Sequence, residues 1–101
     1  MSSNITSAMD MYSMQRIVSA DWLQPGEVIF HEPRGHYYEL LHRTLIKSDV
    51  KGGSWSKGWC YQEVKSVEVL KNCIRHEPPA GEVYSRPNEL FDEDWRLVTP
   101  M

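Results

Sequence analysis

The chain has 101 residues, 41% hydrophobic and 25% charged, with a formal net charge of −3 and a sequence pI of about 5.7. This length fits one domain, because two separate cores of half the size would each be marginal. The composition argues against disorder of the whole chain, and the acidic balance argues against broad attraction to nucleic acid, which needs a basic face.

Residues 1–20 differ from the rest of the chain, since they hold four of its five Met residues and no Gly or Pro. Ile5, Met9 and Tyr12 fall near helical spacing, and Ser7 is a suitable N-cap. Isolated helices of this length are marginal in water unless they dock on a surface. The pattern therefore predicts a flexible tail or a short N-terminal helix over 1–20, followed by one small β-barrel domain over 21–101.

Two turn signals organise the next part of the chain. Pro25-Gly26 precedes the β-rich run 27–31, and a second Pro/Gly turn separates that run from 36–47. Segment 36–47 carries apolar groups on both faces, as expected for a bent strand that serves two layers of a small barrel. A helix is the competing interpretation, because three apolar residues beginning at Tyr38 also fall at helical spacing.

The stretch 49–57, which contains Gly52 and Gly53, predicts a mobile loop, because paired glycines make ordering costly in entropy. Residues 58–64 then alternate between two faces and predict a strand. Segment 65–74 fits either a continuing strand or a short helix beside the sheet, since its apolar residues satisfy both periodicities.

The closing segment predicts a strand over 82–86, a one-turn helix begun by Pro87 and a final strand ending at Val98. Short strands with Gly/Pro turns favour a mainly β fold, a small SH3-like antiparallel barrel with this one-turn helix near the C-terminus. The predicted core residues are Val28, Phe30, Tyr38, Leu40, Leu90, Phe91 and Leu97.

A three-part pattern, G-x-x-Y-x-[VL]-L, then V-Y, then W-V-R-P-x-x-x-F, is matched in the same order by three segments of the chain. These are Gly35–Leu41, Trp59–Glu63 and Val83–Phe91. In this pattern residues 25–98 resemble a family of small bacterial and phage proteins known only as a domain of unknown function. Ser85 departs from the pattern, and residues 65–80 form an insertion. The resemblance implies an SH3-like fold and brings no established activity.

Histidines and cysteines invite a metal site, but only Cys73 and His76 have the spacing typical of zinc ligands. Cys60 lies in a predicted strand, and this position favours a packed thiol over a reactive one. Both thiols are expected to be structural. No consistent set of nucleophile, base and oxyanion groups emerges. We therefore expect no catalytic residues, no metal and no cofactor, and a protein that is not an enzyme.

The N-terminus lacks a basic flank followed by a long apolar run, and no run approaches the ~18 apolar residues of a bilayer span. A cytoplasmic protein with no membrane contact is the expectation.

Protein interaction is the function that the sequence favours most, because exposed aromatic and Met side chains suit adaptable contact surfaces. The partner is expected to be a host or phage factor that the protein modulates, with counter-defence as one such role, or a second copy of the chain. The predicted partner-binding residues are Trp55, Lys57, Trp59, Met9 and Tyr12.

Nucleic-acid binding is a disfavoured alternative, because small barrels bind single strands through aromatic platforms beside basic residues. Tyr61 and Arg86 would join the surface in that case. The same two residues would serve a third function, the binding of a nucleotide-like small molecule in an oligomer.

Overall fold

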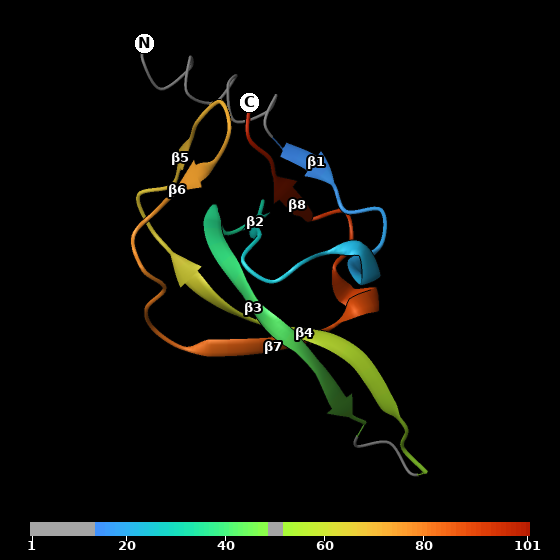
Figure 1. Ribbon diagram of the computed structural model, residues 1–101. Helices are drawn as coiled ribbons and strands as arrows, with labels where there is room; N and C mark the ends of the chain where they lie inside the picture. The colour runs from blue at the N-terminus through green and yellow to red at the C-terminus, as the bar shows by residue number, and fades with distance from the viewer. Residues whose placement is uncertain (1–13, 49–51) are drawn as a thin grey trace.

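The computed structural model describes residues 14–48 and 52–101, which form a mainly β fold (Figure 1). One antiparallel sheet has the order β1-β8-β2-β3-β4-β7. Its strands are β1 (Met14–Arg16), β8 (Trp95–Val98), β2 (Val28–His31), β3 (His36–Lys47), β4 (Trp55–Val64) and β7 (Val83–Pro87). A second, two-stranded sheet pairs β5 (Glu68–Val69) with β6 (Ile74–Arg75), and two short 3-10 helices are η1 (Ala20–Trp22) and η2 (Asn88–Leu90).

The predicted mainly β, antiparallel architecture is confirmed. The predicted closed barrel is not, because within the described ranges the strands form an open sheet. Its two edges are β1 and β7, and they do not pair with each other. Both edges are short, and Pro87 at the end of β7 has no N–H to donate to a further strand. The η1 and η2 turns lie next to each other beside the sheet (Figure 1), joined by a hydrogen bond from the Asn88 amide to the Asp21 carboxylate.

Strand β3 resolves the helix-or-strand ambiguity of segment 36–47 in favour of the strand. It pairs with β2 through the predicted hairpin and with β4 along its whole length. The register between β3 and β4 shifts between Leu40 and His42, which is the bend expected of a strand that serves two parts of the molecule.

At the N-terminus, Met14–Arg16 pair with β8, with Met14 opposite Val98. The prediction of a tail or helix is therefore wrong for these three residues. Pairing with the edge of β8 satisfies their backbone hydrogen bonds, whereas a short isolated helix is only marginally stable. The helix expected over the preceding residues lies outside the described residues.

Segment 65–74 is neither a helix nor a continuation of β4. Its residues form the β5–β6 hairpin, which presents Val67, Val69 and Ile74 to a small cluster on one face of the main sheet. Val28, Val64 and Val98 make up the buried part of that cluster. Hence the insertion covers apolar surface that the sheet would otherwise expose.

The main core lies on the other face of the sheet, against η1 and η2. Its buried residues are Ala20, Leu23, Ile29, Tyr38, Leu40, Trp59, Tyr61, Phe91 and Trp95. Aromatic rings dominate the contacts, with Tyr61 stacked edge-on against Phe91 and Trp95 at centroid distances of 5.9 and 5.6 Å. Offset and edge-on pairs of this kind add stability beyond the area that they bury.

Four of the seven predicted core residues, Val28, Tyr38, Leu40 and Phe91, are buried, and Phe30 and Leu97 pack partly buried against the two clusters. Leu90 is the error, with 48% of its surface exposed. A 3-10 turn rotates ~120° per residue, so adjacent residues cannot both point inward. Phe91 takes the inward position, and Leu90 points to solvent.

Across the ranges that the structure describes, no helix has the length and apolar character needed to span a bilayer.

Candidate functional site

Strands β3 and β4 continue beyond the rest of the described structure, which we call the body, as a two-stranded arm made of Thr44–Lys47 and Trp55–Gly58 (Figure 1). Leu45 pairs with Lys57 and Lys47 pairs with Trp55. At the base of the turn, the Ser48 amide donates to the Ser54 carbonyl at 3.1 Å. β3 and β4 therefore form a hairpin, and their connection is shorter than the predicted loop 49–57 because Trp55–Lys57 already belong to β4.

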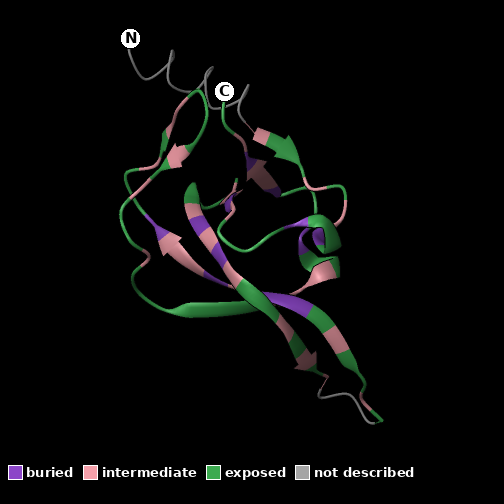
Figure 2. Cartoon of the chain, viewed as in Figure 1, coloured by how far each residue is buried: buried purple, intermediate pink, exposed green. Residues whose placement is uncertain are grey.

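One face of the arm carries the side chains of Leu45, Lys47, Trp55 and Lys57, because directly opposed residues of an antiparallel pair share a face. We call these four residues the arm face. Leu45 and Trp55 are 60% and 61% exposed. Figure 2 shows buried residues where β3 and β4 run through the body. It shows no buried residue in the coloured part of the arm's far end.

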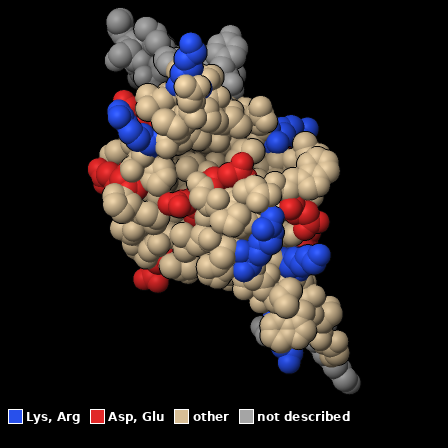
Figure 3. All heavy atoms as spheres, viewed as in Figure 1, with Lys and Arg blue, Asp and Glu red and all other residues tan. Residues whose placement is uncertain are grey.

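Basic groups border the exposed apolar groups of the arm face. Lys47 Nζ lies 5.9 Å from the Trp55 ring centroid, and at the base of the arm the Arg43 guanidinium lies 4.7 Å from the Trp59 ring. Within the described residues, Arg43, Lys47 and Lys57 form no ion pair. In the space-filling view, basic but no acidic side chains are visible on the coloured part of the arm (Figure 3). This surface therefore combines uncovered apolar area with positive charge that forms no ion pair among the described residues.

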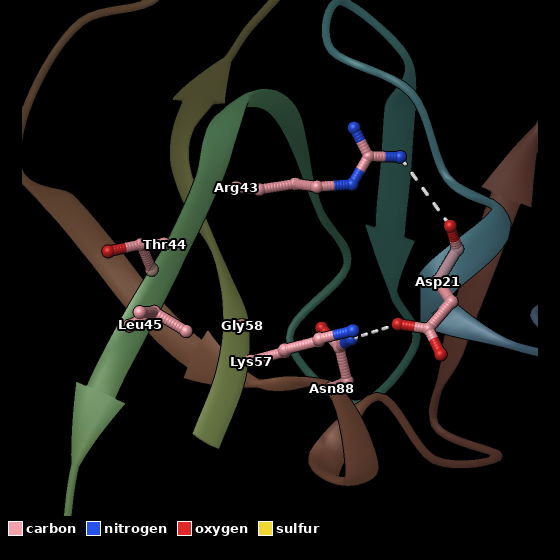
Figure 4. A pocket seen from close by; sticks show the side chains of 7 residues that line it. All are labelled: Asp21, Arg43, Thr44, Leu45, Lys57, Gly58 and Asn88. Carbon is pink, nitrogen blue, oxygen red and sulfur yellow. Dashed lines mark hydrogen bonds between the residues drawn. The ribbon is translucent and has the colours of Figure 1, made fainter. Parts of the chain in front are cut away.

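A groove of about 600 Å³ lies where the arm meets the body. Its lining residues are Asp21, Arg43, Thr44, Leu45, Lys57, Gly58 and Asn88 (Figure 4). Volumes of this order accommodate small ligands or a few side chains of a partner.

The polar groups of the groove are held in place by neighbours on both sides. Arg43 Nη2 donates to the Leu23 carbonyl at 2.7 Å and more weakly to the Asp21 carbonyl at 3.5 Å. The Asp21 carboxylate is engaged by the Asn88 side-chain amide at 2.8 Å (Figure 4). Arg43 therefore contacts the backbone of Asp21 and not its carboxylate, and its positive charge stays available to a ligand.

Gly58 permits the close approach of strands at the base of the arm. A Cβ at this position would lie 2.5 Å from the Arg86 carbonyl oxygen and 2.6 Å from Ile46 Cδ1. Because the first of these atoms belongs to the backbone of β7, only glycine fits without moving a strand.

The structure describes three of the five predicted partner-binding residues and places them in two different settings. Trp55 and Lys57 lie together on the arm face. Trp59 continues the same side of β4 but is 0% exposed, since the body covers it and its Nε1–H donates to the Ala20 carbonyl at 3.0 Å. It is a core residue and cannot touch a partner. Met9 and Tyr12 lie outside the described residues.

Sequence reasoning missed Leu45, Arg43 and Asn88. The cross-strand register, which brings Leu45 opposite Lys57 and Arg43 opposite Trp59, supplies the missing information. Asn88 belongs to a distant segment, and its proximity to the arm could not be foreseen from local pattern.

Tyr61 and Arg86, named for the nucleic-acid alternative, are brought together, but inside the body. Arg86 Nε donates to the Tyr61 hydroxyl at 3.3 Å, and the guanidinium lies 4.9 Å from the Trp95 ring. Tyr61 is 5% exposed and therefore offers no stacking platform to a base. Arg86 is half-buried and packs over the core.

His31 also stacks on Trp95, with ring centroids 4.4 Å apart. Burial lowers the pKa of His31 below its usual value, and the positive charges of Arg34 and Arg86 act in the same direction. Its Nδ1 is buried and has no hydrogen-bond partner among the described residues. The neutral ring is thus the form that suits the folded body.

Both cysteines are free, with Cys60 half-buried and Cys73 exposed. The expectation of two structural thiols is wrong for Cys73, because the β5–β6 hairpin that carries it projects its turn to solvent. In the part of the chain that is described, no three His, Cys, Asp or Glu side chains lie close enough together to hold a metal ion.

No family model, no curated protein and no solved structure matches this chain. The resemblance to the small bacterial and phage domain, and with it the SH3-like relation, stays a prediction.

Proposed function

We propose that this chain is a non-enzymatic binding module that contacts a protein partner through the arm face. The observation that carries the proposal is the exposure of Leu45 and Trp55, 60% and 61%, on an arm that projects from a well-packed body. Uncovered large apolar side chains grouped on one surface mark interaction sites, and Trp is among the residues most enriched at binding hot spots.

The arm suits this role because its backbone is already ordered by the β3–β4 ladder. A partner that binds it does not have to fold a loop, so less conformational entropy opposes association. The same ladder holds Leu45 and Trp55 on one side, where both can be covered by a single partner surface.

A protein partner is favoured over nucleic acid by two features. An exposed aliphatic side chain such as Leu45 gains little from a phosphate backbone, and burial removes Tyr61 as a stacking platform. Nucleic-acid binding remains the second candidate, because Arg43, Lys47 and Lys57 lack counter-ions among the described residues and would suit phosphates.

The resemblance noted in the sequence favours a host or phage protein as the partner, an accessory role in the cytoplasm and an SH3-like relation of the sheet. A second copy of the chain is the other partner that the arm face would fit.

The test is affinity capture of the tagged protein from its host, with partners identified by mass spectrometry and nucleic acid detected by the absorbance ratio. Three proteins are compared: the unmodified chain, Trp55→Ala and Trp22→Ala. Trp22 is 72% exposed on η1, where it lies near Arg16 and Leu97 and does not line the groove at the base of the arm, and it provides a matched control.

A partner that is retained by the unmodified chain and by Trp22→Ala but lost by Trp55→Ala supports the proposal. Equal retention by both tryptophan variants would contradict it. Copurified nucleic acid that is released between low and moderate salt would favour the second candidate, since phosphate contacts weaken steeply with salt.

A further inference from the structure

We propose that the groove at the base of the arm receives a carboxylate side chain from an acidic segment of the protein partner. The inference rests on the proposed function, because it names the chemistry of the partner that the arm face would bind. Its basis is the arrangement of charge in the groove, which is independent of the exposed Trp55.

Two cations reach the groove from neighbouring strands, Arg43 from β3 and Lys57 from β4. Arg43 is fixed from behind by the Trp59 ring and by the Leu23 carbonyl, so its guanidinium is oriented before any ligand arrives. A guanidinium that is already positioned binds a carboxylate with less loss of side-chain entropy.

Among the described residues that line the groove, Asp21 alone is acidic, and its carboxylate accepts a hydrogen bond from the Asn88 side-chain amide at 2.8 Å. Neither Arg43 nor Lys57 forms an ion pair with it within 4.0 Å. The described lining therefore presents two positive groups and one negative group, and the negative group is hydrogen-bonded to Asn88 and not to either cation. One carboxylate from outside would complete the charge balance.

An acidic peptide fits these features better than a nucleic acid does. Leu45 lines the groove and continues into the exposed apolar surface of the arm face, so apolar side chains next to the carboxylate would also find contacts. A run of phosphates would face the Asp21 carboxylate and a chain of net charge −3, whereas a single carboxylate meets mainly the two cations.

The probe is a fluorescein-labelled peptide in which Glu and Leu alternate, compared with the same peptide carrying Gln for Glu. Binding is measured by fluorescence anisotropy at moderate salt to the unmodified chain, to Lys57→Gln and to Lys65→Gln. Lys65 is exposed on the body beyond β4, so it controls for the loss of one positive charge from the molecule as a whole.

The Glu peptide should bind the unmodified chain and Lys65→Gln equally, and Lys57→Gln should weaken it on the order of tenfold, as for a lost charge-assisted hydrogen bond. The Gln peptide should bind more weakly by a similar factor. Reversal of the charge in Lys57→Glu should reject the Glu peptide and accept a matched Lys–Leu peptide, a result that general destabilisation cannot produce.

Absence of Glu-peptide binding, or equal binding to Lys57→Gln and Lys65→Gln, would overturn the inference. So would tighter binding of a labelled single-stranded oligonucleotide that also depends on Lys57. A captured partner that requires Trp55 but tolerates Lys57→Gln would overturn the carboxylate site and leave the proposed function standing, whereas a partner indifferent to Trp55 would remove the proposed function itself.

Discussion

Strands β3 and β4 run through both the body and the arm, but their large side chains are buried in the body and exposed in the arm. On one face of β3 and β4, Leu40 and Trp59 are 0% exposed in the body, whereas Leu45 and Trp55 are 60% and 61% exposed in the arm. The covering elements make the difference, because η1 and η2 pack over the body, and no described element packs over the arm face.

This difference shows that the alternation of side chains along a strand does not reveal which large side chains are buried in a core and which remain exposed for contact. Trp55, Lys57, Trp59 and Tyr61 follow one another at strand spacing, and the sequence offers no mark where the core ends. Only the placement of distant segments, Ala20–Trp22 and Asn88–Leu90, decides which of these side chains is covered. Apolar residues that are kept on the uncovered portion need another explanation, and partner binding supplies one.

The largest expected effect lies in the body. Trp59→Ala should reduce the free energy of unfolding by about 3–5 kcal/mol, because it removes a fully buried indole and leaves a cavity. It also removes one of the two donors to the Ala20 carbonyl, the other being the Leu23 amide. Equilibrium unfolding in urea measures the change, and a loss below about 1 kcal/mol would mean that the body does not depend on this ring.

The second effect tests the junction between body and arm. Gly58→Ala should cost about 1–3 kcal/mol of unfolding free energy, since a new methyl group would overlap the Arg86 carbonyl. Ser56→Ala, two residues along the same strand, provides a control that should stay within about 0.5 kcal/mol. If the two variants were equally stable, β4 and β7 would not approach as closely as the structure shows.

These two predictions also mark the limits of reasoning from sequence. Turn residues and strand alternation were enough for the β2–β3 hairpin, the strand character of 36–47, the short turn at Asn88–Leu90 and the closing strand. The open edge of the sheet, the burial of Trp59 and the groove at Asn88 depend on contacts between distant segments, which local pattern does not contain. Trp55 and Lys57 were predicted together as residues of the glycine-rich loop, whereas the structure places both on strand β4.

A smaller effect concerns the pH dependence of the body. Because the pKa of His31 in the folded protein lies below the usual value of 6.5, the unfolded chain takes up a proton first as the pH falls. The stability provided by neutral His31 is complete above pH 6.5 and is lost as the pH falls from there toward the folded-state pKa.

His31→Phe should keep the stacking on Trp95 and remove this titration, so its melting temperature should fall less than that of the unmodified chain between pH 7 and pH 5. Thermal unfolding at a series of pH values provides the measurement. Parallel curves for the two proteins would show that His31 does not couple protonation to folding. Binding through the arm should be unaffected by the variant, because His31 lies in the body.

The central claim is that the arm face serves binding and not stability, and Trp55→Ala tests it most directly when both quantities are measured on the same protein. The free energy of unfolding should change by less than about 1 kcal/mol, the order of an exposed cation–π contact with Lys47. Affinity for the captured partner should fall by about 2 kcal/mol or more, roughly thirtyfold. A loss of stability comparable to that of Trp59→Ala, or an unchanged affinity, would contradict the account.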